Sequence, residues 1–200
     1  MSRMDIDLPF ILASKSPRRR RLLARLGLEF TVHVSPAEEV IPPDADPASL
    51  VETLAREKAA PVADAHPDAL VLAADTVVAL DGAILGKPAS RTEAATMLQR
   101  LSGTTHTVYT GIALVHRRTD RTVTAVEATE VTFGVLDAEE VAAYVATGSP
   151  MDKAGSYGIQ DDLGALFVER IAGDYYNVVG LPLRRLYRLL RAQFPEAFSF

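Results

Sequence analysis

Short apolar runs alternate along this chain with longer segments whose apolar residues recur every three or four positions. The runs are typical of buried strands, and the recurring pattern is typical of helices with one face on a core. Strands are expected at residues 8–13 and 30–35, within 68–88 and 105–136, and at 165–171 and 176–181. Helices are expected at residues 17–26, 46–63, 90–103, 137–148 and 182–194.

Several of these elements carry local start and stop signals. Ser16 stands where an N-cap belongs, Pro17 follows at the first helical position, and Gly27 ends the helix. Pro61 is expected to stop the second helix, because proline lacks a backbone N–H and clashes with the preceding turn. The dipeptide at 81–82, Asp-Gly between apolar segments, predicts a tight hairpin.

The order of the elements indicates the architecture. Early strands separated by helices favour parallel pairing, and the adjacent later strands favour antiparallel pairing. We therefore expect an α/β protein with a mixed sheet and flanking helices. A length of 200 residues, 48% of them hydrophobic, is enough for one core. A single domain over residues 1–200 is expected, and the sequence permits two lobes within it.

Composition and charge exclude several classes of protein. The chain has no cysteine, so disulfides and thiolate metal sites are excluded and a cytoplasmic location is expected. A net charge of −5 and a pI near 5.4 argue against general binding to nucleic acid or membranes. No apolar run reaches the length of a membrane span, and the first residues do not resemble a signal peptide. Any recognition of anions is therefore expected to be local.

Four consecutive arginines, at positions 18–21, follow the first strand. At about 100° per residue, Arg19 falls inside the apolar stripe of the helix, Arg18 falls on its flank, and Arg20 and Arg21 point away from it. Two interpretations stay open. The run is either an ordinary solvated helix start or, for Arg18 and Arg19 together with Ser14, a phosphate site at a helix N-terminus.

Asp75 follows an apolar run and is expected at the end of a buried strand. A carboxylate there requires a cation or hydrogen-bond donors, so Asp75 is a candidate metal ligand or general base. The alternative is an acid that caps the following turn. Lys87 follows the hairpin and is a candidate for the same region, or a surface charge. Glu38 and Glu39 lie in a loop and are further candidates for a divalent cation.

The segment SPMDKAGSYGIQDDLGALF, residues 149–167, has almost no hydrophobic periodicity. Such a stretch inside a domain is either a plain surface loop or a functional one. Gly155 and Gly158 would allow the backbone to approach a ligand closely. Gln160 offers both a donor and an acceptor, which suits the edge of a nucleobase.

Several common catalytic motifs are absent from the sequence. It contains no Gly-x-Ser-x-Gly elbow, no Walker phosphate loop and no Gly-x-Gly-x-x-Gly fingerprint. Its four histidines are scattered without metal-ligand spacing, so zinc is not expected. His66 and His116 are expected at the surface, whereas His106 begins a strand and is compatible with either face.

Several long segments in one order resemble the Maf family of nucleoside triphosphate pyrophosphatases. They are LASKSPRRRRLLARLG, LAREKA, AADTVVALDGAILGKP, AATMLQRLSGTTHTVYTG, DKAGSYGIQ and YYNVVGLPL, which together run from about residue 10 to 191. The resemblance implies hydrolysis of a nucleoside triphosphate to the monophosphate and pyrophosphate with a divalent cation, Mg²⁺ or Mn²⁺. It also implies a mixed α/β fold around a long cleft, similar to the inosine triphosphatase fold, and a link to septum formation.

The resemblance also implies roles for individual residues. Asp75 matches the acid that activates water, and Glu39 matches an acid near the metal, with its register against Glu38 left open. Positions associated with substrate choice are matched by Arg18, Thr76 and Gln160. Polar positions on the triphosphate are matched by Ser14, Arg19, Lys87 and Lys153.

The stretch DKAGSYGIQ resembles the branch of the family that acts on dTTP and UTP. One departure is that Asp161 and Asp162 stand where a glycine is expected soon after the glutamine. Two carboxylates there would either repel a triphosphate or help to bind a metal. Two rival functions are a pyrophosphatase that prefers 7-methyl-GTP or ITP and a non-enzymatic regulator of division. No stable nucleic-acid or membrane partner is expected, and a homodimer is compatible with the sequence.

Overall fold

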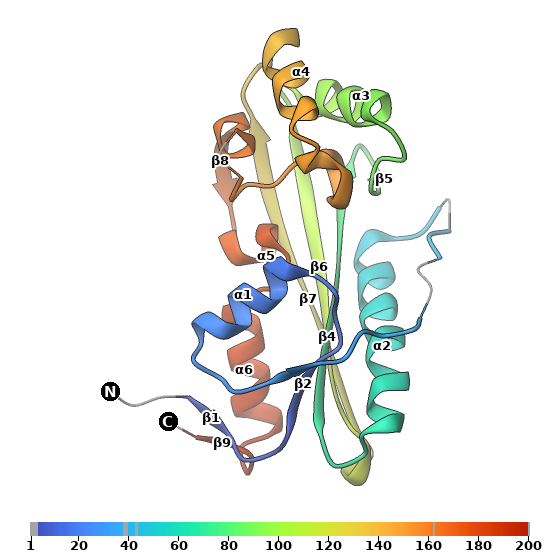
Figure 1. Cartoon of the computed structure of the whole chain (residues 1–200), viewed down its shortest axis with the longest axis vertical. Coiled ribbons are helices and arrows are strands. Elements are labelled where there is room, and N and C mark those ends of the chain that lie inside the picture. Colours follow the sequence, from blue (N-terminus) through green and yellow to red (C-terminus); the bar gives the residue numbers. More distant parts are fainter. Residues whose placement is uncertain (1–3, 38–39, 43, 162, 200) are drawn as a thin grey trace. The chain divides into compact units, whose positions relative to one another are not determined.

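The computed structural model describes residues 4–37, 40–42, 44–161 and 163–199 (Figure 1). The α-helices are α1 (Pro17–Arg25), α2 (Pro47–Ala65), α3 (Arg91–Leu101), α4 (Ala138–Ala146), α5 (Tyr175–Val179) and α6 (Leu183–Gln193). The strands are β1 (Asp5–Ile6), β2 (Phe10–Leu12), β3 (Thr31–Val32), β4 (Leu70–Leu80), β5 (Ala83–Leu85), β6 (Thr105–His116), β7 (Arg121–Phe133), β8 (Val168–Ala172) and β9 (Phe198–Ser199). Short 3₁₀ turns are η1 (Arg117–Thr119), η2 (Ser149–Asp152), η3 (Ala154–Ser156) and η4 (Gly164–Phe167).

The main sheet is mixed, with a hydrogen-bonded order of β3-β2-β4-β6-β7-β8 and with β5 paired to β4. β2 runs parallel to β3 and β4, whereas β4–β5 and β7–β8 are antiparallel. Both parallel pairs are joined through helices, as a parallel connection requires, while the antiparallel pair β7–β8 also has a helix, α4, in its connection. The expected α/β class with a mixed sheet and flanking helices is confirmed, while the long cleft and the single domain stay predictions.

The chain divides into two compact units. Unit 1 comprises Met1–Asp75, Thr110–Glu127 and Gly180–Phe200, and unit 2 comprises Thr76–Tyr109 and Ala128–Val179. Three of the four unit boundaries therefore fall inside the long strands β4, β6 and β7, and the fourth follows α5. Among the described residues, no helix is both long and apolar enough to cross a bilayer.

The core of unit 1 forms where α2 covers the sheet. Its buried cluster takes Ile11 from β2, Val71 from β4 and Val115 from β6, together with small residues of α2. In Figure 1, α2 and α6 lie on either side of the unit 1 strands. Gly111 of β6 allows the closest approach, because a Cβ there would lie 2.2 Å from the backbone oxygen of Val51 in α2.

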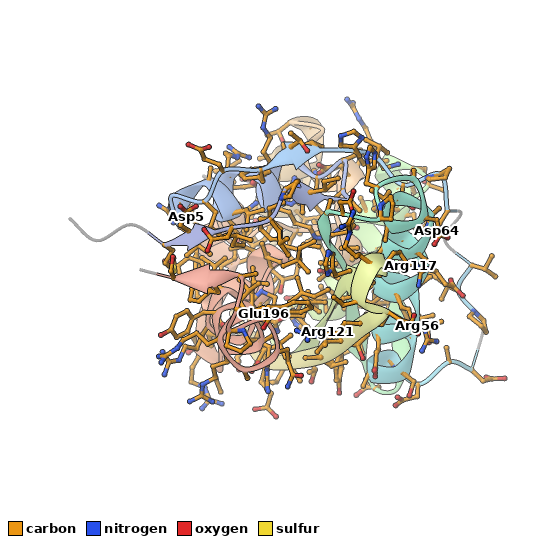
Figure 2. The ribbon with its side chains drawn as sticks, turned by 90° about the horizontal axis from the view of Figure 1, so that it is seen from below. Asp5, Arg56, Asp64, Arg117, Arg121 and Glu196 are labelled. Carbon is orange, nitrogen blue, oxygen red and sulfur yellow. The ribbon has the colours of Figure 1, made fainter. Side chains whose placement is uncertain are left out.

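Ion pairs join the β6–β7 end of unit 1 to its helices. Arg117 of η1 donates to Asp64 of α2 at 2.6 Å, and Arg121 of β7 donates to Glu196 after α6 at 2.7 Å. Figure 2 shows these four labelled side chains from below. The pairs are partly or largely exposed, and exposed pairs contribute at most about 1 kcal/mol each. They therefore add little to the buried apolar core of unit 1.

In unit 2 the helices α3 and α4 lie side by side, with η2 and η3 against them. The expected hairpin joins β4 to β5, and both turn residues, Asp81 and Gly82, have positive φ angles of 51° and 80°. Two positive φ angles at a two-residue loop are the signature of the turn that matches strand twist. The hairpin prediction is confirmed.

Three local expectations are wrong. α2 continues past Pro61 to Ala65, because burial of Val62 and Ala63 in the core outweighs the one hydrogen bond that proline cannot make. The segment expected as a strand at 176–181 is mostly the helix α5, whose first turn is capped by Asp174. The beginning of the strand expected at 165–171 is η4 instead.

The histidines at the two ends of β6 are both buried. His116, expected at the surface, has only 5% of its area exposed, so that expectation is wrong. His106 is 2% exposed in the core of unit 2, where its Nε2 lies 2.8 Å from the hydroxyl of Tyr157 and its ring meets Phe133 edge-on. Burial lowers the pKa of His106 from 6.5 to about 4, so the ring is neutral at neutral pH.

This buried imidazole is expected to make the protein lose stability as the pH falls from 6.5 to about 4. In that window the unfolded chain binds a proton at His106 and the folded chain does not, so unfolding is favoured by up to about 3 kcal/mol. Chemical denaturation at pH 7 and pH 4.5 measures the loss in the wild type and in His106→Gln. The variant should lose clearly less, with the exposed His33→Gln as the control. Equal losses in wild type and His106→Gln would refute the assignment.

Candidate functional site

Asp75, the candidate metal ligand or general base, is a buried acid of unit 1. It lies within β4 rather than at its end, so both the expected strand-end position and the turn-capping alternative are wrong. Only 6% of Asp75 is exposed. The strand continues past Asp75 because the apolar residues before and after it, such as Ala74 and Val77, are buried. A carboxylate in such surroundings requires a partner.

Lys58 of α2 provides that partner. Its ammonium forms an ion pair with Oδ1 of Asp75, and the two side chains are only 12% and 8% exposed. The ammonium supplies the opposite charge that a buried carboxylate requires. The arrangement holds a negative oxygen at a fixed point of β4.

Lys58 is not among the site residues predicted from the sequence, although the sequence contains a signal for it. Lys58 lies one helical turn from both Leu54 and Val62, which are buried, so it interrupts an apolar stripe of α2. A lysine at such a position has to find an anion or reach solvent. The pattern alone could have marked Lys58 as paired, but it could not have named Asp75.

The arginine run divides as the helix geometry predicted. Ser16 caps α1 by accepting from the backbone of Arg19, and Arg20 and Arg21 are exposed. The guanidinium of Arg19 donates through Nε to the carbonyl of Gly180 at 2.8 Å and through Nη1 to Ser14 at 3.4 Å. The structure thus brings Arg19 and the buried Ser14 together beside the N-terminus of α1.

Arg18, the neighbour of Arg19, is half-buried at the start of α1. No acidic residue stands in the first turn of this helix, so its free N–H groups and the arginines make the region positive. That charge, with the Ser14 hydroxyl close by, suits an anion such as a phosphate.

In unit 2, the loop that follows β5 meets the segment that follows η2. The backbone N–H of Gly155 donates to the carbonyl of Gly86 at 3.1 Å. This bond places exposed Lys87 and buried Lys153 on neighbouring loops. Gly155 has a φ of 68°, and a Cβ on it would lie 2.9 Å from Val78 of β4. The glycine is therefore needed for close packing of this loop on the protein itself.

Thr76, the remaining predicted residue on β4, is the first residue of unit 2 and is half-buried. It follows Asp75 directly, so the two side chains alternate across the strand and project to opposite faces of the sheet. The adjacency in sequence therefore does not bring Thr76 and Asp75 onto one face.

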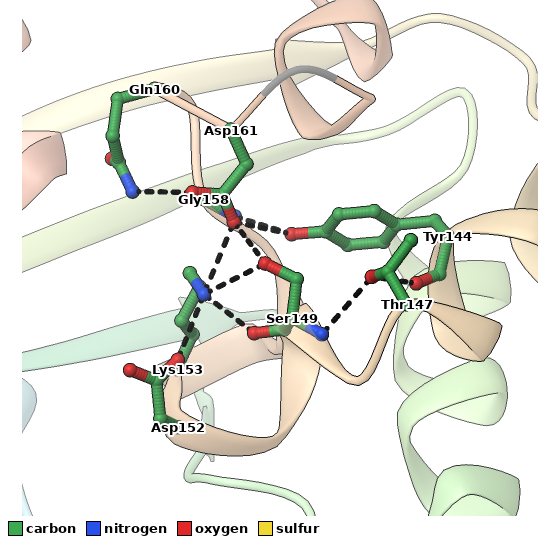
Figure 3. Close-up of polar contacts among 8 residues, drawn as sticks. All are labelled: Tyr144, Thr147, Ser149, Asp152, Lys153, Gly158, Gln160 and Asp161. Carbon is green, nitrogen blue, oxygen red and sulfur yellow. Dashed lines mark hydrogen bonds and ion pairs between the residues drawn. The ribbon is translucent and has the colours of Figure 1, made fainter.

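Lys153 is 7% exposed and is held by oxygens of unit 2 (Figure 3). Its ammonium donates to the carbonyl of Ser149 at 2.5 Å and to Asp152 at 2.8 Å, and it lies 3.1 Å from Asp161. Because an ammonium has three protons, these acceptors engage all of them. A phosphate that binds Lys153 would have to replace one of these acceptors. The carboxylate of Asp152 is the easiest to replace, because it is 59% exposed and can be solvated by water when it leaves.

Asp161 lies at the centre of this cluster. It accepts from the hydroxyls of Ser149 at 2.5 Å and Tyr144 at 3.0 Å and from the amide of Gln160 at 2.9 Å. Burial by itself raises the pKa of Asp161, but the hydrogen bonds and the charge of Lys153 outweigh it and hold that pKa below its usual range. Asp161 is thus an anion, and its charge is directed at groups of unit 2. Asp162 lies outside the described residues.

The donors available to a divalent cation can be compared with what such a cation requires. Mg²⁺ commonly takes one or two carboxylates and completes its shell with phosphates and water. Asp75 offers one buried carboxylate. Within the described ranges no three Asp, Glu or His side chains gather, and Glu39 and Glu38 lie outside them. Among the described residues, the one carboxylate of Asp75 suits only a cation that takes its other ligands from phosphates and water.

Comparison with known proteins gives the family. The model of the Maf-like protein family matches residues 9–193. The chain belongs to the Maf family. A Maf relative from Salinibacter ruber, named dTTP/UTP pyrophosphatase, is 60% identical over 193 residues, which cover 96% of this chain and 95% of the relative. A relative from Bacillus cytotoxicus with the same name is 54% identical over 190 residues, covering 95% and 97%. One from Bacillus anthracis, also so named, is 53% identical over 181 residues, covering 90% and 93%.

Both units of this Maf chain contain polar groups that suit a nucleotide. In unit 1 a buried, lysine-paired carboxylate and a cationic helix start with two arginines are present. In unit 2 an amide, two lysines and a threonine hydroxyl come from β4 and the two loops just described. A carboxylate is suited to accept a proton or hold a cation, and the cations are suited to bind phosphoryl oxygens.

Proposed function

We propose that this Maf chain hydrolyses dTTP and UTP to the corresponding monophosphate and pyrophosphate. The observation that carries the proposal is the identity of 53–60%, over at least 90% of the chain, to three relatives named dTTP/UTP pyrophosphatase. Because the similarity covers at least 90% of the chain, a shared reaction is favoured over a shared fold alone. The enzyme is then a hydrolase of nucleotide metabolism that acts on the bond between the α- and β-phosphates.

Asp75 is proposed as the catalytic residue. A water molecule attacks the α-phosphorus in line with the bridging oxygen, the bond to the β-phosphate breaks, and pyrophosphate leaves. The carboxylate of Asp75 accepts the proton of that water. Its pairing with Lys58 supports this role, because the ion pair restricts the carboxylate to one position.

A divalent cation, Mg²⁺ or Mn²⁺, is proposed as the cofactor, with Asp75 and Glu39 as its ligands. When bound, such a cation neutralises phosphoryl charge and lowers the pKa of bound water. The buried carboxylate of Asp75 supports a hard oxygen ligand on β4.

The substrate-binding residues are proposed separately for each unit. In unit 1 they are Ser14, Arg18 and Arg19, supported by the cluster at the start of α1. In unit 2 they are Thr76, Lys87, Lys153 and Gln160, of which Gln160 contacts the base. We further propose that residues 1–200 act as a single domain and that the enzyme is cytoplasmic, which its lack of cysteine supports.

A nucleotide panel tests the function. Purified protein with Mg²⁺ is incubated with dTTP, UTP, CTP, GTP, ITP and 7-methyl-GTP, and both monophosphate and pyrophosphate are measured. We expect dTTP and UTP to be hydrolysed fastest, with equal amounts of the two products. Faster turnover of another base would reject the proposed preference and keep the reaction. Release of orthophosphate, or no hydrolysis at all, would reject the reaction itself.

A further inference from the structure

The cluster around Asp161 contains a feature that the proposed reaction does not use. Oδ1 of Asp161 receives the amide nitrogen of Gln160 at 2.9 Å, while Oδ2 receives Tyr144, Ser149 and Lys153. The two oxygens thus have separate tasks. One anchors the carboxylate to unit 2, and the other contacts a residue proposed to bind the base.

An ionised carboxylate decides how the neighbouring amide is oriented. It only accepts hydrogen bonds, so the NH₂ group of Gln160 must face it and the amide oxygen must turn away. Figure 3 shows this arrangement, with the oxygen of Gln160 on the side opposite Asp161. The reversed amide would put two acceptors against each other. Gln160 therefore presents its amide oxygen, with one remaining N–H beside it, to its surroundings.

An acceptor at this position distinguishes between pyrimidine bases. Uracil and thymine carry an N3–H donor, which an amide oxygen can accept. Cytosine carries an unprotonated N3 acceptor at the same point, and two facing acceptors repel. A site that is built to accept one hydrogen bond rejects the analogue that lacks the donor.

We propose that Asp161 is a positioning residue that sets the preference for uracil and thymine over cytosine by fixing the amide of Gln160 as an acceptor. This inference rests on the proposed function for the nature of the ligand. Asp161 itself does not touch the base. It acts through Gln160. Asp161, which departs from the family pattern, would in this way contribute to recognition of the base.

The surroundings of Asp161 are built to keep it in place. Tyr144 is 1% exposed, and its hydroxyl donates to Asp161 while accepting from the backbone of Gly158 at 3.0 Å. A Cβ on Gly158 would lie 2.6 Å from Oδ2 of Asp161 and 2.7 Å from Cε of Lys153. The absence of a side chain at 158 is therefore what allows the carboxylate and the ammonium to meet. The charge of Lys153 keeps the carboxylate ionised, and so an obligate acceptor.

The test compares UTP with CTP, which differ only in the base edge that Gln160 is proposed to contact. The ratio of their kcat/KM values is measured for wild type, Asp161→Asn, Gln160→Ala and the double variant. Because Tyr144, Ser149 and Lys153 contact one oxygen of residue 161, an asparagine there should turn its NH₂ group towards Gln160. The amide of Gln160 is then no longer fixed as an acceptor, and the ratio should fall about tenfold. The fall should come mainly from KM. In the Gln160→Ala background, Asp161→Asn should change the ratio no further.

Tyr144→Phe is the matched control, since it removes one donor to Asp161 without touching the bond to Gln160. Its UTP/CTP ratio should stay near the wild-type value even where its thermal stability is lower. An unchanged ratio in Asp161→Asn, or the same fall with and without Gln160, overturns the proposal. So does a wild type that shows no preference for UTP.

Binding measurements separate this proposal from the reaction. The α,β-methylene analogues of UTP and CTP, which cannot be cleaved at the α–β position, are titrated into the same four proteins. If the wild type binds the UTP analogue better and Asp161→Asn removes the difference, the inference stands even if no nucleotide is hydrolysed. If UTP is hydrolysed but no binding preference depends on Asp161, the proposed function stands and the inference fails. Binding of neither analogue by the wild type overturns the inference.

Discussion

Replacing Asp75 by asparagine is expected to lower the kcat for dTTP hydrolysis about 10³-fold while the protein stays folded. The amide keeps the shape of the side chain and still accepts a hydrogen bond from Lys58, but it no longer accepts a proton from water. It also loses the negative charge that a divalent cation requires. Pyrophosphate release measures the loss, and thermal unfolding shows that the variant is folded.

Asp64→Asn is the matched control for this variant. Asp64 lies on α2 of the same unit and is also paired with a cation, Arg117, but its side chain is 63% exposed. Its activity should remain within a factor of two of wild type. Turnover close to normal in Asp75→Asn would remove Asp75 from the mechanism. If Asp75→Asn is inactive because it is unfolded, its thermal unfolding curve will show this. Asp75→Glu, which keeps the negative charge, is then measured in its place.

Local signals were enough to predict much of the fold. The N-cap of α1 and the 81–82 hairpin each depend on residues that lie within a few positions of one another. The wrong predictions concern segments whose secondary structure depends on packing against residues far away in the sequence. Pro61 is tolerated because the core of unit 1 buries the next two residues, and α5 forms because Asp174 caps an apolar run that also suits a strand.

The sequence was enough to predict individual residues of the candidate site, but not the contacts between them. Helix geometry correctly separated Arg19 from Arg20 and Arg21, because that separation depends only on 3.6 residues per turn. The partners of the predicted residues were not predictable. Lys58 meets Asp75 across 17 positions, and Tyr144 meets Asp161 across another 17, so each contact exists only after the chain has folded. The family resemblance supplied candidate positions, and the structure supplied the contacts that orient them.

Gly111→Ala is expected to lower the free energy of unfolding by about 3 kcal/mol. The added Cβ would lie 2.2 Å from the carbonyl oxygen of Val51 and 2.7 Å from the amide nitrogen of Glu52, which are backbone atoms that no rotamer change can move. Ordinary contact begins at 3.4 Å, so α2 and β6 would have to separate by roughly 1 Å. For a chain of this size the melting temperature should fall by about 6 to 12 °C.

The consequence reaches the site, because α2 also carries Lys58, which holds Asp75. Well below its melting temperature, Gly111→Ala should therefore show a reduced kcat with a smaller change in KM. Gly134→Ala is the control, since a Cβ there meets nothing within 4 Å and the stability should change by less than about 0.5 kcal/mol. Equal melting temperatures for the two variants would mean that α2 is free to shift on β6, and the spacing at Gly111 would then not fix the Lys58–Asp75 pair.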